Sequence, residues 1–143
     1  MRVLIDTNIA LDFLLQREQF FQNAELLFDA IDSGQVIGYV TATTLTDIFY
    51  IARRHTRRIE QARQAITEIL SVMEICPVNR VVLESALGLG WIDFEDAVQV
   101  ACAVAQGLDA IVTRDRQDFS NSPVTVLSVQ ELLLRLALQD SSQ

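Results

Sequence analysis

The sequence predicts an α/β domain in three layers, in which helices cover both faces of a mostly parallel sheet of five strands. Short apolar runs alternate with longer segments whose apolar residues recur at helical spacing. Val3-Leu4-Ile5 and Ala110-Ile111-Val112 are apolar at every position, as suits parallel strands buried on both faces. Only five glycines and two prolines interrupt the 143 residues, so we expect a single compact domain.

The first half of the chain is expected to hold two strands and four helices. In order, the sequence predicts a strand at 2–6, helices at 9–15 and 22–33, a strand at 36–40, and helices at 44–54 and 59–73. Thr7 or Asn8 is the expected N-cap of the first helix. Gly34 is placed to end the second.

The second half continues the same alternation. The predicted elements are a strand at 74–78, helices at 80–89 and 94–106, strands at 109–113 and 124–127, and a closing helix at 129–138. Pro77 favours an edge position for the strand that carries it, because proline cannot donate to a sheet. We expect the domain to cover residues 1–138 and residues 139–143 to form a flexible tail.

Composition excludes several classes of protein. No apolar run approaches the roughly 18 residues that span a bilayer, and the apolar run before Asp6 is too short for a signal-peptide core. Cys76 and Cys102 are expected to stay reduced, so a cytoplasmic protein is indicated. All eleven cationic residues are arginine, and lysine is absent. With His55 as the one histidine, a zinc site is not expected.

Carboxylates follow or precede several of these elements. Asp6 follows the first strand and Asp115 follows the fourth, so both belong to the edge of the sheet where α/β proteins form their sites. Asp47 and Asp96 lie in the first turns of helices that border the same edge. We expect all four side chains to face one crevice. Asp12, by contrast, has no strand-end position, and with Asp29 and Asp32 it is expected to be a surface charge.

Each acid also has a purely structural explanation. The segments 44–47 and 93–96 fit helix capping boxes, while Asp115 and Asp118 suit a turn. Together, however, converging carboxylates repel one another and require a cation to stay ionised. Mg²⁺ or Mn²⁺, which prefer oxygen ligands, would meet that need.

Four segments in this order resemble the PIN-domain ribonucleases, in particular the small bacterial VapC-type toxins. They are Leu4-Ile5-Asp6-Thr7-Asn8, the threonine-rich 43–47 segment, Asp93-Phe94-Glu95-Asp96-Ala97, and Thr113-Arg114-Asp115 with Asp118-Phe119. The resemblance implies a ribonuclease that binds Mg²⁺ or Mn²⁺, forms a homodimer and pairs with a cognate antitoxin. It also implies 5′-phosphate and 3′-hydroxyl products.

The resemblance assigns roles residue by residue. It implies that Asp6, Asp96 and Asp115 bind metal and that Asp47 joins them as a catalytic acid, although the family more often has glutamate there. Asp118 is implied to be an accessory acid. Thr7, Asn8 and Thr113 match polar positions that orient the acids or the attacking water.

Catalysis by a divalent ion needs no histidine base, because the ion lowers the pKa of bound water and neutralises charge on the phosphate. Positive charge for RNA is concentrated at four arginines, which could equally belong to a solvated turn or an interface. They are Arg53, Arg54, Arg57 and Arg58.

Other readings of the acidic pocket are weaker. Dehalogenase-like phosphatases and receiver domains also need a lysine, which this chain lacks. A nuclease specific for DNA structures would need additions that clamp DNA, for which the chain has little room. The remaining alternative is a PIN-fold module that binds nucleic acid or protein with weak or no catalysis.

Overall fold

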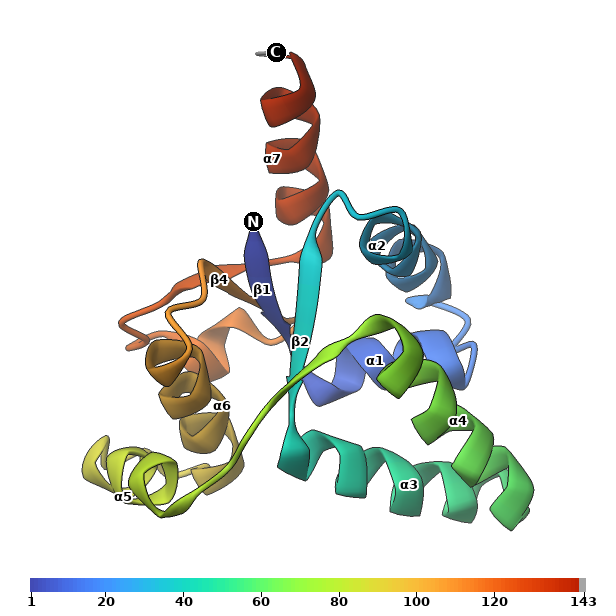
Figure 1. Ribbon diagram of the computed structural model, residues 1–143, viewed down its shortest axis with the longest axis horizontal. Coiled ribbons are helices and arrows are strands. Elements are labelled where there is room, and N and C mark those ends of the chain that lie inside the picture. The colour runs from blue at the N-terminus through green and yellow to red at the C-terminus, as the bar shows by residue number, and fades with distance from the viewer. Residues whose placement is uncertain (142–143) are drawn as a thin grey trace.

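The computed structural model of the protein describes residues 1–141 and contains one parallel five-stranded sheet (Figure 1). The strands stand in the order β3-β2-β1-β4-β5, and every neighbouring pair is parallel. They are β1 (Arg2–Ile5), β2 (Ile37–Thr41), β3 (Glu74–Cys76), β4 (Ala110–Val112) and β5 (Thr125–Leu127). The predicted fold class is therefore confirmed.

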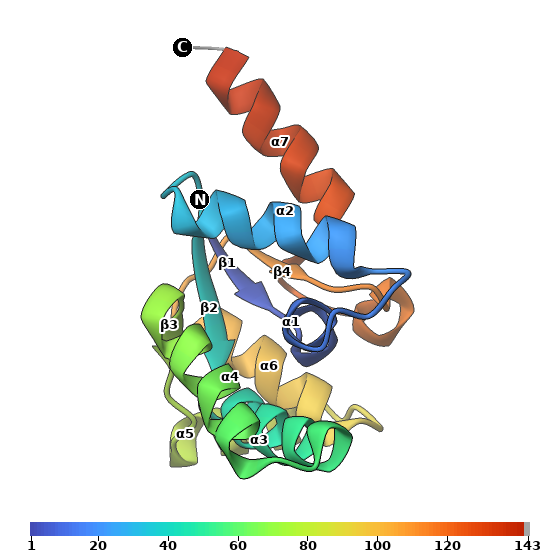
Figure 2. The same cartoon turned by 90° about the vertical axis from the view of Figure 1, so that its right-hand side faces the viewer.

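The helices form layers on the two faces of this sheet. They are α1 (Thr7–Leu14), α2 (Phe21–Asp32), α3 (Ala42–Thr56), α4 (Ile59–Val72), α5 (Arg80–Gly88), α6 (Phe94–Ala105) and α7 (Val129–Ser141), with a short 3₁₀ helix η1 (Arg116–Phe119). One core cluster joins the sheet to α1, α2, α3, α4 and α7. A second cluster joins the opposite face to α5 and α6. Figures 1 and 2 show α7 projecting beyond the other elements.

β1 is the centre of both clusters. Val3 and Ile5 belong to the first cluster and Leu4 to the second, and all three are fully buried. This alternation explains why the strand is apolar at every position, because both of its faces are covered. The same arrangement aims the carboxyl ends of β1, β2 and β4 at one edge of the sheet, where α1, α3 and η1 begin.

Most predicted elements are present, but some boundaries differ. Helix α1 begins at Thr7 with Asp6 as its N-cap, so the prediction of Thr7 or Asn8 as the cap is wrong. The main-chain carbonyl of Asp6 accepts from the N–H groups of Ile9 and Ala10, while its carboxylate makes other contacts. Helix α3 begins two residues early because the Thr41 hydroxyl caps it by accepting from the Thr44 N–H.

The closing helix and the edge strand also differ from their predicted boundaries. Helix α7 runs to Ser141, three residues beyond the predicted end, so residues 139–141 of the expected tail are helical. Residues 142–143 of that tail lie outside the described residues. Strand β3 lies at an edge of the sheet, as predicted. It ends at Cys76, so the predicted strand at 74–78 is two residues too long and Pro77 lies just outside it. No described helix is both long and apolar enough to cross a membrane.

Candidate active site

An open cleft of about 380 Å³ lies at the carboxyl ends of the strands. Seven carboxylate side chains line it, from Asp6, Asp47, Asp93, Glu95, Asp96, Asp115 and Asp118. The remaining lining residues are Thr7, Asn8, Tyr50, Ile51, Arg54 and Gln99. The acids come from the ends of β1 and β4, from α3 and from the start of α6, so segments far apart in the sequence meet here.

Asp6 is held in place by two neutral donors. Its side chain is only 6% exposed. The Gln99 amide donates to Oδ1 at 3.0 Å, and the Thr113 hydroxyl donates to Oδ2 at 2.8 Å. The same Thr113 oxygen accepts from the main-chain N–H of Asp115 at 3.0 Å, which links the two acids. Each Asp6 oxygen keeps further acceptor capacity, so the carboxylate is oriented without being saturated.

Threonine hydroxyls connect the ends of the first two strands. The Thr7 and Thr44 hydroxyl oxygens are 2.9 Å apart, and the Thr41 hydroxyl donates to Thr44 at 3.0 Å. All three side chains are buried. This chain of hydrogen bonds ties the start of α1 to the start of α3, and so fixes the helix that carries Asp47 relative to the one that follows Asp6. Thr7 lines the cleft, and its hydroxyl is engaged with Thr44.

Asp12 is a buried anion behind the cleft, so its assignment as a surface charge is wrong. Its side chain is 1% exposed and receives a two-pronged contact from Arg114, at 2.8 Å to Oδ2 and 3.2 Å to Oδ1. Arg17 contacts Asp12 at 3.3 Å and also donates to Asn8 at 3.3 Å. The Arg114 guanidinium lies over the Phe20 ring, 3.8 Å from its centroid. Two arginines adjoining the cleft therefore share one counterion.

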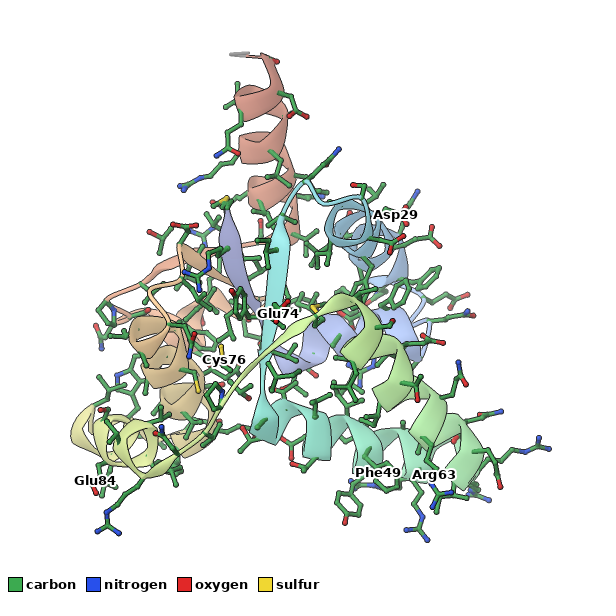
Figure 3. All side chains as sticks on the ribbon, viewed as in Figure 1. Asp29, Phe49, Arg63, Glu74, Cys76 and Glu84 are labelled. Atoms are coloured by element: carbon green, nitrogen blue, oxygen red, sulfur yellow. The ribbon has the colours of Figure 1, made fainter. Side chains whose placement is uncertain are left out.

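Asp29 and Asp32 are exposed as predicted, and Figure 3 labels Asp29 at the periphery of α2.

The acids at the start of α6 have few donors. Asp93 caps this helix by accepting from the Asp96 N–H at 3.1 Å, which confirms one of the two capping predictions. Burial, followed by repulsion from Asp93, Asp6, Asp118 and Asp115, raises the pKa of Asp96 to about 7. A hydrogen bond with Asp47, then burial and repulsion from neighbouring acids, raises the pKa of Glu95 to about 8. Glu95 therefore retains its proton near neutral pH.

The structure brings most of the predicted site residues together. Asp6, Asp47, Asp96, Asp115, Asp118, Thr7, Asn8 and Arg54 all line the cleft. Thr113 lies behind Asp6 as its hydrogen-bond donor. Arg53, Arg57 and Arg58 are exposed at the end of α3 and in the following turn, and they do not line the cleft. The capping box predicted at 44–47 is wrong, because Thr41 is the cap and Asp47 faces the cleft instead.

Sequence reasoning missed four residues of this region. Gln99 lies three positions after Asp96 and Tyr50 three positions after Asp47, a spacing that places each pair on one helix face. Glu95 stood inside a motif already singled out. Asp12 had no such signal, because its partner Arg114 is 102 residues away in the sequence.

The donor set suits a hard divalent cation. Every ionisable acid of the cleft offers oxygen, the ligand that Mg²⁺ and Mn²⁺ prefer. Burial and then repulsion from neighbouring acids raise the pKa of Asp96, and a bound cation would offset that repulsion. Within residues 1–141, no three acidic, histidine or cysteine side chains stand close enough together to hold an ion as they are placed. Coordination by three acids therefore requires some of them to move inward.

Comparison with known proteins identifies the family. The sequence profile of the PIN domain matches residues 2–117, which is most of the chain and includes Asp6, Asp47, Asp96 and Asp115. The chain belongs to the PIN-domain family. It is 21% identical over 139 residues to Ribonuclease VapC1 of Aquifex aeolicus, and the match covers 94% of each chain.

Solved PIN-domain structures share the fold at low identity. DNA-bound VapBC from Salmonella typhimurium matches with a TM-score of 0.72 and 14% identity, over 90% of this chain and 98% of that one. Mycobacterium tuberculosis VapC20, described as a toxin that cleaves the sarcin–ricin loop, matches with a TM-score of 0.70 and 17% identity. That match covers 86% of this chain and 96% of VapC20. At such identities the likeness concerns the fold.

Proposed function

We propose that this PIN-domain protein is a divalent-metal-dependent endoribonuclease and the toxin of a toxin–antitoxin pair. The observation that carries the proposal is the cleft itself, where seven carboxylates converge and one arginine is the only cationic residue among those lining it. Such an excess of negative charge is costly to a fold and repels a polyanion unless a cation is bound. The similarity to Ribonuclease VapC1 supports RNA as the substrate.

Asp6, Asp96 and Asp115 are the residues that would hold Mg²⁺ or Mn²⁺, with Asp47 and Asp118 beside them. When bound, such an ion supplies an acidified water and neutralises charge on the phosphate. Gln99 and Thr113 keep the Asp6 side chain aimed at the cleft, because both donate to its oxygens. Thr113 extends this control to Asp115 through the main chain.

Glu95 lies beside Asp47 and compensates for the aspartate that stands at position 47, where the family more often has glutamate. Aspartate at position 47 is one methylene shorter than the glutamate common in the family, and Glu95 reaches it from the opposite side of the cleft. The proton on Glu95 can pass to a leaving oxygen, since the pKa of Glu95 is raised to about 8. The proposed products are a 5′-phosphate and a 3′-hydroxyl.

Cleavage assays test the proposal directly. Purified protein with Mn²⁺ is expected to cut a mixture of structured and unstructured RNAs, whereas the Asp6→Asn variant should lose at least about 100-fold in rate, as expected when an essential charge is removed from a metal site. Asp29→Asn, a matched change on exposed α2, should cleave like the wild type. If the wild type and Asp6→Asn were equally inert on every RNA while a partner still bound, the protein would be an interaction module instead.

A partner and an assembly state belong to the same proposal. Solved relatives include toxin–antitoxin complexes from Klebsiella pneumoniae and Salmonella typhimurium, which supports a cognate antitoxin for this chain. We also propose a homodimer that acts in the cytoplasm, where RNA is available and the free thiols of Cys76 and Cys102 stay reduced. Co-purification with the product of an adjacent gene, and sedimentation of the purified chain, test these points.

A further inference from the structure

Tyr50 is an exposed aromatic side chain at the acidic cleft. It is 61% exposed and lines the cleft together with Asp47 and Arg54. Large aromatic surfaces left in water usually mark a place where something else stacks or packs. Tyr50 is the one aromatic residue among those lining the cleft, and neither its ring nor its hydroxyl is needed by the acids around Asp6.

Three chemically different side chains follow one face of α3. Asp47, Tyr50 and Arg54 are spaced by three and four residues, so they lie in a row along the helix. At about 1.5 Å of rise per residue, Tyr50 is roughly 4.5 Å and Arg54 roughly 10 Å further along the axis than Asp47. The row therefore runs from acid to aromatic ring to guanidinium, beginning inside the cleft and continuing outward.

The Tyr50 ring has an aromatic neighbour and stays largely exposed. Phe49 contacts it edge-on, with centroids 5.3 Å apart and an angle of 89° between the rings. Phe49 itself packs against the core, and Figure 3 labels it on α3. A ring supported by such an edge contact loses little freedom when a second planar group stacks on it.

Arg54 is a free cation beside a strongly negative site. It forms no ion pair within residues 1–141, and nor do Arg53, Arg57, Arg58 or Arg63. Among the residues lining the cleft, Arg54 is the one cation set against seven acids. An RNA phosphate that approaches the acids needs a cationic hydrogen-bond donor, and the Arg54 guanidinium is the one that lines the cleft.

We propose that Tyr50 and Arg54 form a platform for single-stranded RNA, on which an unpaired base stacks on Tyr50 while a neighbouring phosphate contacts Arg54. The inference rests on the proposed ribonuclease function and deepens it by naming two residues that would hold the substrate. Bases in a duplex have both faces covered, so only an unpaired nucleotide can present a face to the ring. The cleaved bond would then lie next to an unpaired base, in a single strand, loop or bulge.

Binding measurements test the platform in a background that cannot cut. The probe is a fluorescein-labelled oligoribonucleotide of about 12 residues, a length within the usual range of single-strand sites, used single-stranded and as a duplex with its complement. The proteins are full-length Asp6→Asn and the same chain carrying Tyr50→Leu, Tyr50→Phe, Arg54→Gln or, as the matched cation control, Arg53→Gln. All of these additional changes fall on exposed side chains, and melting curves would check that the variants fold.

Tyr50→Leu is expected to weaken single-strand binding by roughly 5- to 150-fold, the usual effect of losing one stacked base, and to leave duplex binding unchanged. Tyr50→Phe should bind like the parent, because it keeps the ring. Arg54→Gln should reduce the slope of log affinity against log salt by about 0.7, the value for one phosphate contact on a single strand. Arg53→Gln should change this slope less.

Several results would overturn the platform. They are normal single-strand binding by Tyr50→Leu, equal weakening for single strand and duplex, and no affinity of the parent for single strands. A change in sedimenting mass of Tyr50→Leu with unchanged RNA affinity would assign this face to a protein interface instead. If the wild type cleaves RNA and Tyr50→Leu binds single-stranded RNA as tightly as the parent, the platform is contradicted and the ribonuclease function is retained. If the wild type does not cleave RNA but Tyr50→Leu still weakens single-strand binding, the ribonuclease function is contradicted and the platform is retained.

Discussion

The two sides of the acidic cleft are built differently. On the strand side, Asp6 accepts hydrogen bonds from Gln99 and Thr113, and the buried Asp12 behind it is paired with two arginines. On the helix side, Asp47, Glu95 and Asp96 face other acids, and the pKa values of Glu95 and Asp96 are raised. The strand side is therefore organised before any ligand arrives, whereas the helix side holds negative charge that a cation would stabilise.

The largest expected effect comes from breaking the strand side at Asp12. Replacing Asp12 by alanine removes the buried counterion of Arg114 and Arg17 and should cost about 3 kcal/mol of unfolding free energy, the lower end for a broken buried ion pair. The lower end applies because Arg114 is still 26% exposed. Urea denaturation measures the loss, with Asp29→Ala on α2 as the matched control.

A second substitution sharpens the same test. Adding Arg114→Met to Asp12→Ala removes the uncompensated charge and should recover part of the lost stability. A double variant whose stability equals the sum of the two single losses would mean that the two side chains act independently.

A smaller loss is expected at Thr113. Thr113→Val keeps the shape of a fully buried side chain but removes the hydroxyl that donates to Asp6 and accepts from the Asp115 N–H. The cost should be about 2 kcal/mol, because one of the lost hydrogen bonds goes to a charged group. Thr113→Ser retains the hydroxyl and should keep most RNA cleavage, whereas Thr113→Val should not. Equal activity of the two variants would remove Thr113 from the positioning of the acids.

The smallest effect concerns the helix side and its dependence on pH. In metal-free protein the pKa of Asp96 is about 7, against an ordinary value of 3.8, so the folded state binds more protons than the unfolded state between these values. Stability should therefore fall as pH rises from about 4 to about 7, with Glu95 extending the fall to about 8. Asp96→Asn should raise stability at pH 8 by about 1 kcal/mol, reduced for its partial exposure.

Mg²⁺ provides the matching control. At saturation it should raise the Tm of the wild type at pH 8, because binding to the folded state alone is stabilising. The rise should be smaller for Asp96→Asn. A rise of Tm with pH in metal-free wild type, or equal responses of both proteins to Mg²⁺, would contradict the contrast between the two sides.

The strand side and the helix side also differ in how far the sequence predicted them. The positions of Asp6 and Asp115 followed from buried strands that end beside them, because parallel strands share one carboxyl edge. Asp96 and Asp47 followed from helix starts at the same edge. Gln99 and Tyr50 were missed although helical spacing connects them to acids already identified, and Glu95 was missed although it lies inside the 93–97 motif.

The burial of Asp12 could not be predicted from one sequence. Its charge is compensated by Arg114, and no local sequence pattern predicts a partner that lies 102 residues away in the sequence. The α1 boundary was wrong for a related reason, since the Asp6 carboxylate is engaged by Gln99 and Thr113 from distant elements and its main chain alone caps the helix. Local patterns located the elements, and long-range pairing decided which acids were buried.

The central place of β1 has a consequence for synthesis. Residues 2–5 are synthesised well before residues 110–112 of β4, with which they pair, and Asp6 takes its two donors from positions 99 and 113. Such distant pairing makes closure of the domain a late event. A nascent chain therefore lacks an organised site until residue 113 has been synthesised.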